Sequence, residues 1–281
     1  MSADSEEPEA ADRVESIHPT WVPREMDQWC APGGALHGVP TLAELCESGP
    51  HVCADHLGMD AAVSARAAQL AGLGAGPGRV VAWQMPNTAE AVVLYRACFA
   101  IGAVAAPLHH MAGDAEVAAL VDRLQPVVFV TSDGTPAHSP ADAGGADAEG
   151  PAPCDVAVVL HTSGSSGAPK GVMHTHRGLA HKALTMVQVH GLGPTDAVLM
   201  PAPLAHVSGL LNGVLVPAAA GMRSVLMQRW DPEEALDLIE SEHITFMVGP
   251  PTFFIGLEQA AGFDPSRVGS LRLLSVGAAG V

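Results

Sequence analysis

Apolar and polar residues alternate along the chain in blocks that predict strands and helices in turn. Short apolar runs bounded by turn residues are typical of buried strands, and apolar residues every three or four positions are typical of helices. Strands are predicted at about 80–83, 127–131, 156–160, 197–200, 223–226, 245–248 and 271–275. Helices are predicted at about 61–73, 88–101, 114–124, 177–189, 207–220 and 231–241. This alternation predicts an α/β fold with mostly parallel sheets and helices on both faces.

Two segments fit neither pattern. Residues 1–20 are acidic and poor in large apolar side chains, so we expect a mobile tail. Residues 133–154 are mostly Asp, Gly, Ala, Pro, Ser and Glu, which bury too little area to offset the entropy of ordering. We expect an exposed linker there, within one partial domain that spans residues 21–281.

Composition and charge narrow the class of protein. Of the 281 residues, 48% are hydrophobic and 15% are charged, as in globular chains. The formal net charge of −17 argues against a nucleic-acid partner, because binding a phosphate backbone needs a basic surface. Any phosphate ligand must therefore be held by local N–H groups and a placed cation. The longest apolar run, 207–220, contains Ser208, Asn212 and Pro217 and predicts a buried helix, not a membrane span.

The five cysteines are irregularly spaced, and the first residues lack the features of an export signal. We therefore expect a cytoplasmic chain with reduced thiols. Cys46, Cys53 and His56 could be read as metal ligands, but no second half of a tetrahedral site follows at a suitable spacing. No metal site formed by protein ligands alone is expected.

The stretch 155–178, DVAVVLHTSGSSGAPKGVMHTHRG, carries the clearest chemistry. It predicts a strand, a loop of small and hydroxylated residues, a lysine and then a helix. Glycines let backbone N–H groups approach an anion closely, and Lys170, one of only two lysines, can neutralise polyphosphate oxygens. The N-terminus of the following helix could add its dipole. The residues predicted to hold phosphate are Thr162, Ser163, Gly164, Ser165, Ser166, Gly167 and Lys170.

Two other readings of this loop are weaker. A flexible Gly/Ser linker would not normally lie between a buried strand and a helix. A Walker-type phosphate loop needs four residues between its glycines and a Gly-Lys-Ser/Thr ending. Here two residues separate Gly164 from Gly167, and Gly171 follows Lys170 where a hydroxyl would be required.

The segment DVAVVLHTSGSSGAPKGV resembles the phosphate-loop signature of the adenylate-forming superfamily. That superfamily includes acyl- and aryl-CoA synthetases, luciferases and peptide-synthetase adenylation domains. The loop departs from the family only at Ser166, where Thr is usual and a hydroxyl is kept. The resemblance runs from about residue 61 to the end of the chain. Further segments similar to family motifs are GRVVAWQMPNTAE at 78–90, GAVAAPL at 102–108, PLAHVSG at 203–209 and SVGAA at 275–279.

The resemblance implies roles for particular residues. Lys170 and His206 are expected to be catalytic, with His206 in the substrate pocket. Without the family, His206 is a lone histidine before an apolar helix, and such residues are more often structural. The resemblance also implies that Gly277, Ala278 and Ala279 contact adenine, although the family usually has Pro in place of Ala279. His109, His110, His174 and His176 are interpreted as turn and cap residues.

The resemblance further implies an acyl-CoA ligase that uses ATP, Mg²⁺ and coenzyme A. The small and apolar neighbours of His206 suit a small apolar carboxylic acid better than an amino acid. An aliphatic, alicyclic or aromatic acid is favoured, and the wider similarity leans toward ligases of the cyclohexanecarboxylate–CoA type.

The family pattern continues with motifs that this chain does not contain. They are an aromatic-Gly-x-Thr-Glu motif, an Asp for the ribose hydroxyls, a hinge and a small C-terminal domain with a catalytic Lys. We therefore expect an N-terminal fragment that lacks the C-terminal domain and is inactive alone. Two alternatives remain open: a non-catalytic remnant that binds nucleotide or a partner, and a phosphotransferase.

Overall fold

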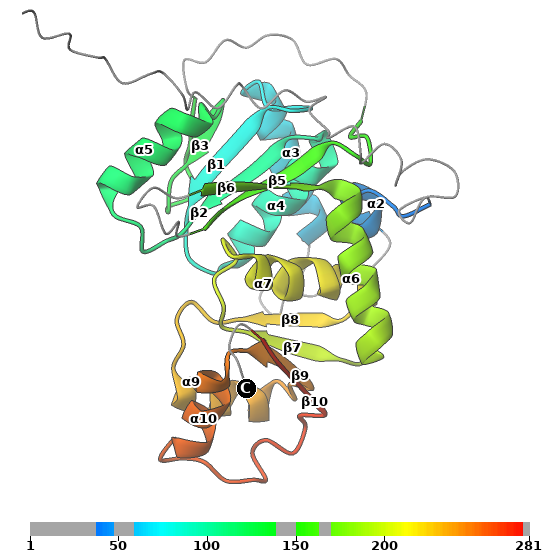
Figure 1. Ribbon diagram of the computed structural model, residues 1–281, viewed down its shortest axis with the longest axis vertical. Helices are drawn as coiled ribbons and strands as arrows, with labels where there is room; N and C mark the ends of the chain where they lie inside the picture. Colours follow the sequence, from blue (N-terminus) through cyan, green and yellow to red (C-terminus); the bar gives the residue numbers. More distant parts are fainter. Residues whose placement is uncertain (1–37, 48–58, 139–149, 163–169, 278–281) are drawn as a thin grey trace, which may run out of the picture.

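The computed structural model describes residues 38–47, 59–138, 150–162 and 170–277. The acidic tail expected at 1–20 lies outside these ranges, as do residues 163–169 of the predicted phosphate loop. Within them the strands form two sheets, one of six strands and one of four (Figure 1).

The six-stranded sheet has the order β4-β3-β1-β2-β5-β6. Its inner strands are parallel, and its edge strands β4 and β6 are antiparallel to their neighbours. The strands are β1 (Val80–Gln84), β2 (Val104–Leu108), β3 (Val128–Val130), β4 (Pro136–His138), β5 (Val156–Thr162) and β6 (Lys170–Thr175).

The four-stranded sheet has the order β10-β9-β7-β8 and is parallel throughout. Its strands are β7 (Ala197–Met200), β8 (Arg223–Leu226), β9 (Phe246–Gly249) and β10 (Leu273–Val276). The predicted α/β class with mostly parallel sheets is confirmed.

Helices cover both faces of both sheets. In β1, Val81 and Trp83 join the core shared by the two sheets, whereas Val80 and Ala82 join the core under α5. Burial on both faces explains why these strands are continuous apolar runs. The helices are α2 (Leu42–Glu47), α3 (Met59–Gly72), α4 (Ala89–Ile101), α5 (Asp114–Leu124), α6 (His176–His190), α7 (Val207–Leu210), α8 (Val216–Ala220), α9 (Pro232–Ser241) and α10 (Pro251–Gln259).

One large core joins the two sheets. It contains Val81 and Trp83 of the six-stranded sheet, Val198 and Met200 of the four-stranded sheet, and side chains of α4 and α6 to α8. Helices α9 and α10 cover the outer face of the four-stranded sheet (Figure 1). Most of the apolar run 207–220 is buried in the shared core as predicted, although Val207 at its start is exposed. Between α7 and α8 the run forms a π-helical turn, η1 (Leu211–Leu215).

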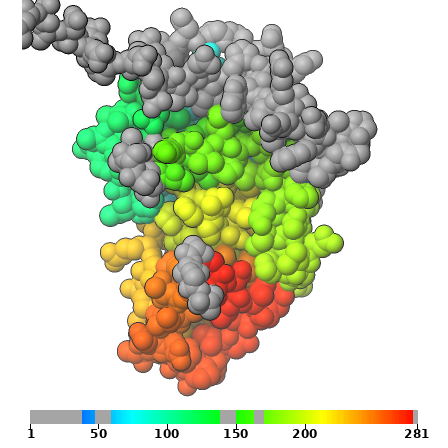
Figure 2. Space-filling view, viewed as in Figure 1, coloured from blue at the N-terminus to red at the C-terminus, as the bar shows by residue number. Residues whose placement is uncertain are grey.

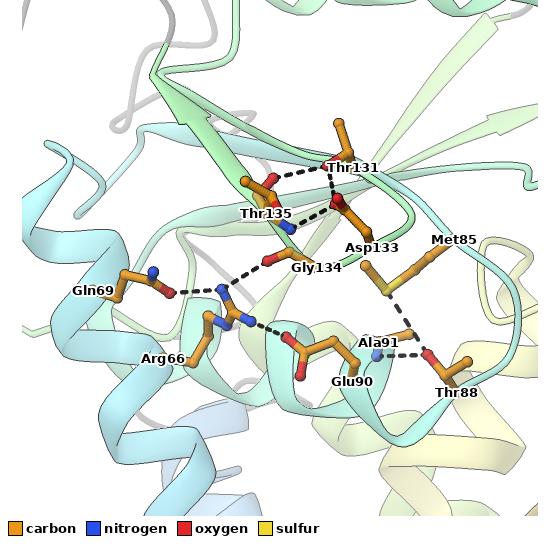
Figure 3. A network of polar contacts seen from close by, with 10 residues as sticks. All are labelled: Arg66, Gln69, Met85, Thr88, Glu90, Ala91, Thr131, Asp133, Gly134 and Thr135. Atoms are coloured by element: carbon orange, nitrogen blue, oxygen red, sulfur yellow. Dashed lines mark hydrogen bonds and ion pairs between the residues drawn. The ribbon is translucent and has the colours of Figure 1, made fainter.

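The expected linker at 133–154 is wrong at its beginning. Thr131 to Thr135 form a tight turn in which the Asp133 carboxylate accepts hydrogen bonds from the Thr131 hydroxyl and the Thr135 N–H. This turn leads into β4, which pairs with β3. Arg66 on α3 donates to the Gly134 carbonyl and also pairs with Glu90 on α4, so the turn is fixed to two helices (Figure 3). Local hydrogen bonds therefore order a segment that has little apolar area.

Two helices were not predicted from the sequence. Pro250 and Pro251 end β9 as expected, but Pro251 is also the first residue of α10. Proline is favourable in a first helical turn because its missing N–H has no partner to lose there. The short α2 begins after Thr41, whose hydroxyl accepts from the Glu44 N–H while the Glu44 carboxylate accepts from the Thr41 N–H. This reciprocal pair is a capping box.

None of the helices in the described part of the chain is long and apolar enough to cross a membrane. The buried Cys46 and Cys98 form no disulfide, whereas Cys154 is disulfide-bonded. The expectation that the thiols are all reduced is therefore not met at Cys154.

Candidate functional site

The two ends of the predicted phosphate loop lie side by side. Thr162 is the last residue of β5 and Lys170 is the first residue of β6, and the antiparallel register pairs them directly. The Thr162 hydroxyl donates to the Lys170 carbonyl at 3.5 Å. Both residues are exposed at this edge of the sheet. The predicted ligands Ser163, Gly164, Ser165, Ser166 and Gly167 lie outside the described residues.

The helix predicted at about 177–189 is confirmed as α6, but an unpredicted strand separates it from Lys170. Residues 170–175 form β6, and α6 begins at His176 with Thr175 as its N-cap. The backbone N–H of His176 donates to the carbonyl of Asp155, which precedes β5. The N-terminus of α6 therefore lies at the opposite end of β5 from Thr162 and Lys170, too far for its dipole to act on a ligand beside them. Strand β6 was not predicted because its residues, KGVMHT, show no alternation of apolar and polar side chains.

His206 begins α7 and serves as its N-cap. Its Nδ1 accepts a hydrogen bond from the Ser208 N–H at 3.2 Å. A nitrogen that accepts carries no proton, so the neutral tautomer has its proton on Nε2. His206 is exposed and offers this Nε2–H as a donor.

Two residues from the layer of the six-stranded sheet hold the segment 202–204, which precedes His206. Asn87, in the turn after β1, donates to the carbonyls of Ala202 and Met227 and accepts from the Leu204 N–H. The Tyr95 hydroxyl on α4 donates to the Leu204 carbonyl at 2.7 Å. Sequence reasoning placed Asn87 in a turn but missed this function, because its partners lie more than a hundred residues away.

A large cavity lies beside His206 and has a volume of about 640 Å³. Its walls come from α6, from the segment 202–212, from the end of β9 with the start of α10, and from Gly277. Figure 2 shows the yellow residues of α7 and η1 on the same face as the yellow-green α6 and the red segment that contains β10. Most of the lining side chains are apolar, among them Leu179, Met186, Val207, Leu211, Val248 and Phe253.

A smaller cavity of about 340 Å³ joins His206 to the phosphate-loop end of the sheet. Thr162, His161 and His109 line it together with Ala205 and His206. Burial, with a contribution from the nearby Arg123 guanidinium, lowers the pKa of His161 below its usual value. His206 is therefore shared by two cavities, one that reaches Thr162 and one that is mainly apolar.

Gly277, predicted to contact adenine, directly follows β10 and lines the large cavity. Its N–H donates to the Gly249 carbonyl at 3.2 Å. Ala278 and Ala279, the other residues of that prediction, lie outside the described residues.

The remaining histidines differ from one another. His109 and His110 lie in the turn after β2, as predicted, with their rings stacked at 4.9 Å. The interpretation is wrong for His174, which is a strand residue in β6, and for His176, which is the fully buried first residue of α6 while Thr175 is the N-cap. Burial lowers the pKa of His176 to about 4. Among the described residues no group of three His, Cys, Asp or Glu side chains is arranged to hold a metal ion.

Residues 58–281 match the family model described as AMP-binding enzyme. The chain belongs to the AMP-binding enzyme family. The resemblance to the adenylate-forming superfamily, in its acyl-CoA synthetase branch, is confirmed.

Relatives in this family include several CoA ligases. The chain is 29% identical over 256 residues to a medium-chain fatty-acid–CoA ligase of Escherichia coli, covering 78% of this chain and 45% of that protein. It is 32% identical over 241 residues to a feruloyl-CoA synthase of Amycolatopsis, covering 79% of this chain and 49% of that protein. The chain thus spans about half the length of these AMP-binding enzymes.

Solved structures share the fold. ATP-bound MatB from Rhodopseudomonas palustris has a TM-score of 0.71 at 24% identity, over 85% of this chain and 54% of that one. The inhibitor-bound N-terminal domain of FACL13 from Mycobacterium tuberculosis has a TM-score of 0.71 at 22% identity, over 85% of this chain and 70% of that one. At these identities the likeness concerns the fold alone.

Proposed function

We propose that this chain supplies the ATP and acid sites of an acyl-CoA ligase. In the proposed reaction a carboxylate oxygen attacks the α-phosphorus of ATP, the bond to the β-phosphate oxygen breaks, and pyrophosphate leaves. The thiol of coenzyme A then displaces AMP from the acyl-adenylate to give the thioester. Family membership and the CoA-ligase relatives support this class of reaction.

The observation that carries the proposal is the position of His206 between two cavities. The smaller cavity reaches Thr162 beside the phosphate loop, and the larger one has the apolar walls that an acyl group needs. An acid in the larger cavity with its carboxylate near His206 would meet the α-phosphate of a nucleotide held at the loop. Holding two reactants in line in this way lowers the entropic part of the barrier.

The loop residues would stabilise the leaving pyrophosphate. We assign Thr162, Lys170 and the loop residues Ser163 to Gly167 to the β- and γ-phosphates, with the Lys170 ammonium balancing their charge. The exposed position of the Thr162 and Lys170 pair leaves both groups open to a ligand. Bound Mg²⁺ would neutralise charge on the same oxygens.

His206 would act as a donor at the junction of the two cavities. Because its Nδ1 already accepts from the Ser208 N–H, its Nε2–H can donate to an oxygen of the carboxylate or of the α-phosphate. We assign the adenine to Gly277, Ala278 and Ala279. The preferred substrate is a small, mainly apolar carboxylic acid, and the acceptor is coenzyme A.

The test begins with ATP binding to the 281-residue chain, measured by isothermal titration calorimetry. Lys170→Ala should weaken ATP binding by about tenfold or more, because a charge-assisted contact to phosphate is lost. Lys170→Arg, which keeps the charge, should bind more tightly than Lys170→Ala. Arg229→Ala removes an exposed cation that lines neither cavity and should leave affinity unchanged. Equal affinity in the native chain and Lys170→Ala would remove the basis of the proposal.

Products from the native chain joined to the remaining part of a family member, from the aromatic-Gly-x-Thr-Glu motif to the end of the C-terminal domain, then identify the reaction. Carboxylate-dependent release of AMP and pyrophosphate supports the ligase. ADP with a phosphorylated acid would instead identify a phosphotransferase, and ATP binding without any product would identify a binding protein.

A further inference from the structure

The wall of the large cavity contains one buried side-chain amide. Asn212 lies in the π-helical turn η1, and only 3% of its surface is exposed. It lines the cavity together with the apolar Leu211, Val248 and Phe253. Asn212 is one of only two asparagines in the chain, and the other, Asn87, has bonds from both ends of its amide.

Backbone geometry fixes which way the Asn212 amide points. Its Nδ2 donates to the carbonyl oxygen of Ser208 at 2.9 Å. A carbonyl can only accept, so the amide cannot be turned over without placing two acceptors together. The remaining atom is therefore the acceptor Oδ1. It is fully buried and has no hydrogen-bond partner in the part of the chain that the structure describes.

An unpaired buried acceptor destabilises a fold unless a ligand or water completes it. Its position in a π-helical turn points to function, because such turns occur often at binding sites. In a regular α-helix the Ser208 carbonyl would accept from the backbone N–H four residues later. Here the Leu211 N–H and the side chain of Asn212 both donate to that carbonyl, and the side-chain bond orients the amide.

We infer that Asn212 selects acids carrying a hydroxyl or N–H donor, which binds the Asn212 Oδ1 at the apolar end of the acyl cavity. This inference rests on the proposed function, in which that cavity holds the acid. Asn212 is a specificity residue here, since the reacting carboxylate lies at the other end, near His206. The preferred substrate is then a hydroxylated or amino-substituted apolar acid rather than a plain hydrocarbon acid.

The spacing along the helix sets the length of that acid. Asn212 follows His206 by six residues, which corresponds to at most about 9 Å along the helix axis at ~1.5 Å per residue, because the π-helical residues 211 and 212 rise less. A donor at the para position of a phenylpropanoic acid is separated from its carboxylate by a comparable distance. A water molecule and the ammonium of Lys182, which lines the same cavity, are the rival partners for Oδ1.

The experiment compares three ligands on the 281-residue chain by isothermal titration calorimetry with ATP present. They are phenylpropanoic acid, its para-hydroxy derivative and its para-methoxy derivative, which has an oxygen but no donor. The para-hydroxy acid should bind about tenfold more tightly than the other two, as expected for one hydrogen bond to a buried, otherwise unpaired acceptor. Three equal affinities would show that Oδ1 is satisfied by water or Lys182 and would overturn the inference.

Two variants separate selectivity from structural damage. Asn212→Leu should abolish the preference for the para-hydroxy acid and leave phenylpropanoic acid bound. Ser224→Ala removes a hydrogen bond to the Gly213 carbonyl of the same turn but does not line the cavity, so the preference should remain. If Asn212→Leu does not fold, the three ligands on the native chain still decide.

The two proposals fail in different ways. Equal binding of the three acids rejects the role of Asn212 and leaves the ligase proposal standing. Absence of binding by all three acids and by ATP rejects both.

Discussion

The Asn87 Oδ1 accepts a hydrogen bond from the backbone N–H of Leu204 at 2.8 Å, and this bond joins the layers of the two sheets. The Asn87 Nδ2 also donates to the Ala202 carbonyl at 2.8 Å and the Met227 carbonyl at 2.9 Å. The turn after β1 therefore fixes the segment that leads into His206. A residue that follows a strand of the six-stranded sheet thus helps to place a side chain of the proposed site.

Asn87→Ala should lower the free energy of unfolding by about 3 kcal/mol or more. The substitution leaves one N–H and two carbonyls of a buried region without partners, and each costs about 1–3 kcal/mol. Urea unfolding of the 281-residue chain measures the change. Gln69→Ala, which removes an exposed amide on α3, should change stability by no more than about 0.5 kcal/mol. Equal effects of the two substitutions would show that Asn87 does not join the layers.

Much of the fold could be predicted from the sequence because local signals agreed with burial. The helix at 114–124 and the strands at 197–200 and 223–226 were predicted at their observed bounds, since their apolar spacing matches the faces they bury. The buried central strand β2 was missed because its Ala and Pro residues have low strand propensity. The strands β4 and β6 were missed because edge strands bury less and carry no such pattern. Their pairing comes from β3 and β5, which a local reading cannot see.

The candidate site was predictable only in part. Thr162, Lys170 and His206 stand out by residue type and motif, and Gly277 by resemblance. The pairing of Thr162 with Lys170 requires β6, and the contact of Asn87 with Leu204 spans 117 residues. Asn212 was noted only as a polar break in an apolar run, because nothing in its neighbours indicates that its amide lines a cavity.

Gly209→Ala should disturb the position of His206. A Cβ at Gly209 would lie 2.0 Å from the Pro203 carbonyl oxygen, so α7 could not keep its present contact with the turn at 203. We expect a loss of about 1–3 kcal/mol in the free energy of unfolding and weaker binding of the acid. Gly72→Ala is the matched control, since a Cβ there would meet no atom within 4 Å. Full acid binding by Gly209→Ala would show that α7 can move without cost.

Because of Asp196, the free energy of unfolding should depend on pH in the acid range. The Arg272 guanidinium is the main cause that holds the pKa of this carboxyl below its usual value, with help from the Thr245 hydroxyl and the Gly193 N–H. A lowered folded-state pKa stabilises the protein fully above the unfolded value of about 3.9, and the contribution is lost as pH falls through the folded value.

The Asp196→Asn substitution tests this dependence. Because the ionised carboxylate contributes mainly above its folded-state pKa, the substitution should lower the free energy of unfolding more at pH 7 than at pH 3, as measured by urea unfolding at each pH. Asp122→Asn, which changes an exposed carboxylate on α5, should show little difference between the two conditions. A cost for Asp196→Asn that does not change with pH would contradict the ion pair with Arg272.

As pH falls, protonation linked to His176 should lower the free energy of unfolding at a higher pH than protonation of Asp196 does. Burial lowers its pKa to about 4, against about 6.5 when unfolded, so the unfolded chain binds the proton first. Stability should fall by about 3 kcal/mol as pH drops from 7 toward 4, because each pKa unit corresponds to about 1.4 kcal/mol.

Both ring nitrogens of His176 are buried without partners among the described residues, so His176→Leu should be neutral or stabilising at pH 7 and should flatten this decline. His181→Leu, at an exposed position on the same helix, should retain the native slope. A decline that survives in His176→Leu would place its origin in another group.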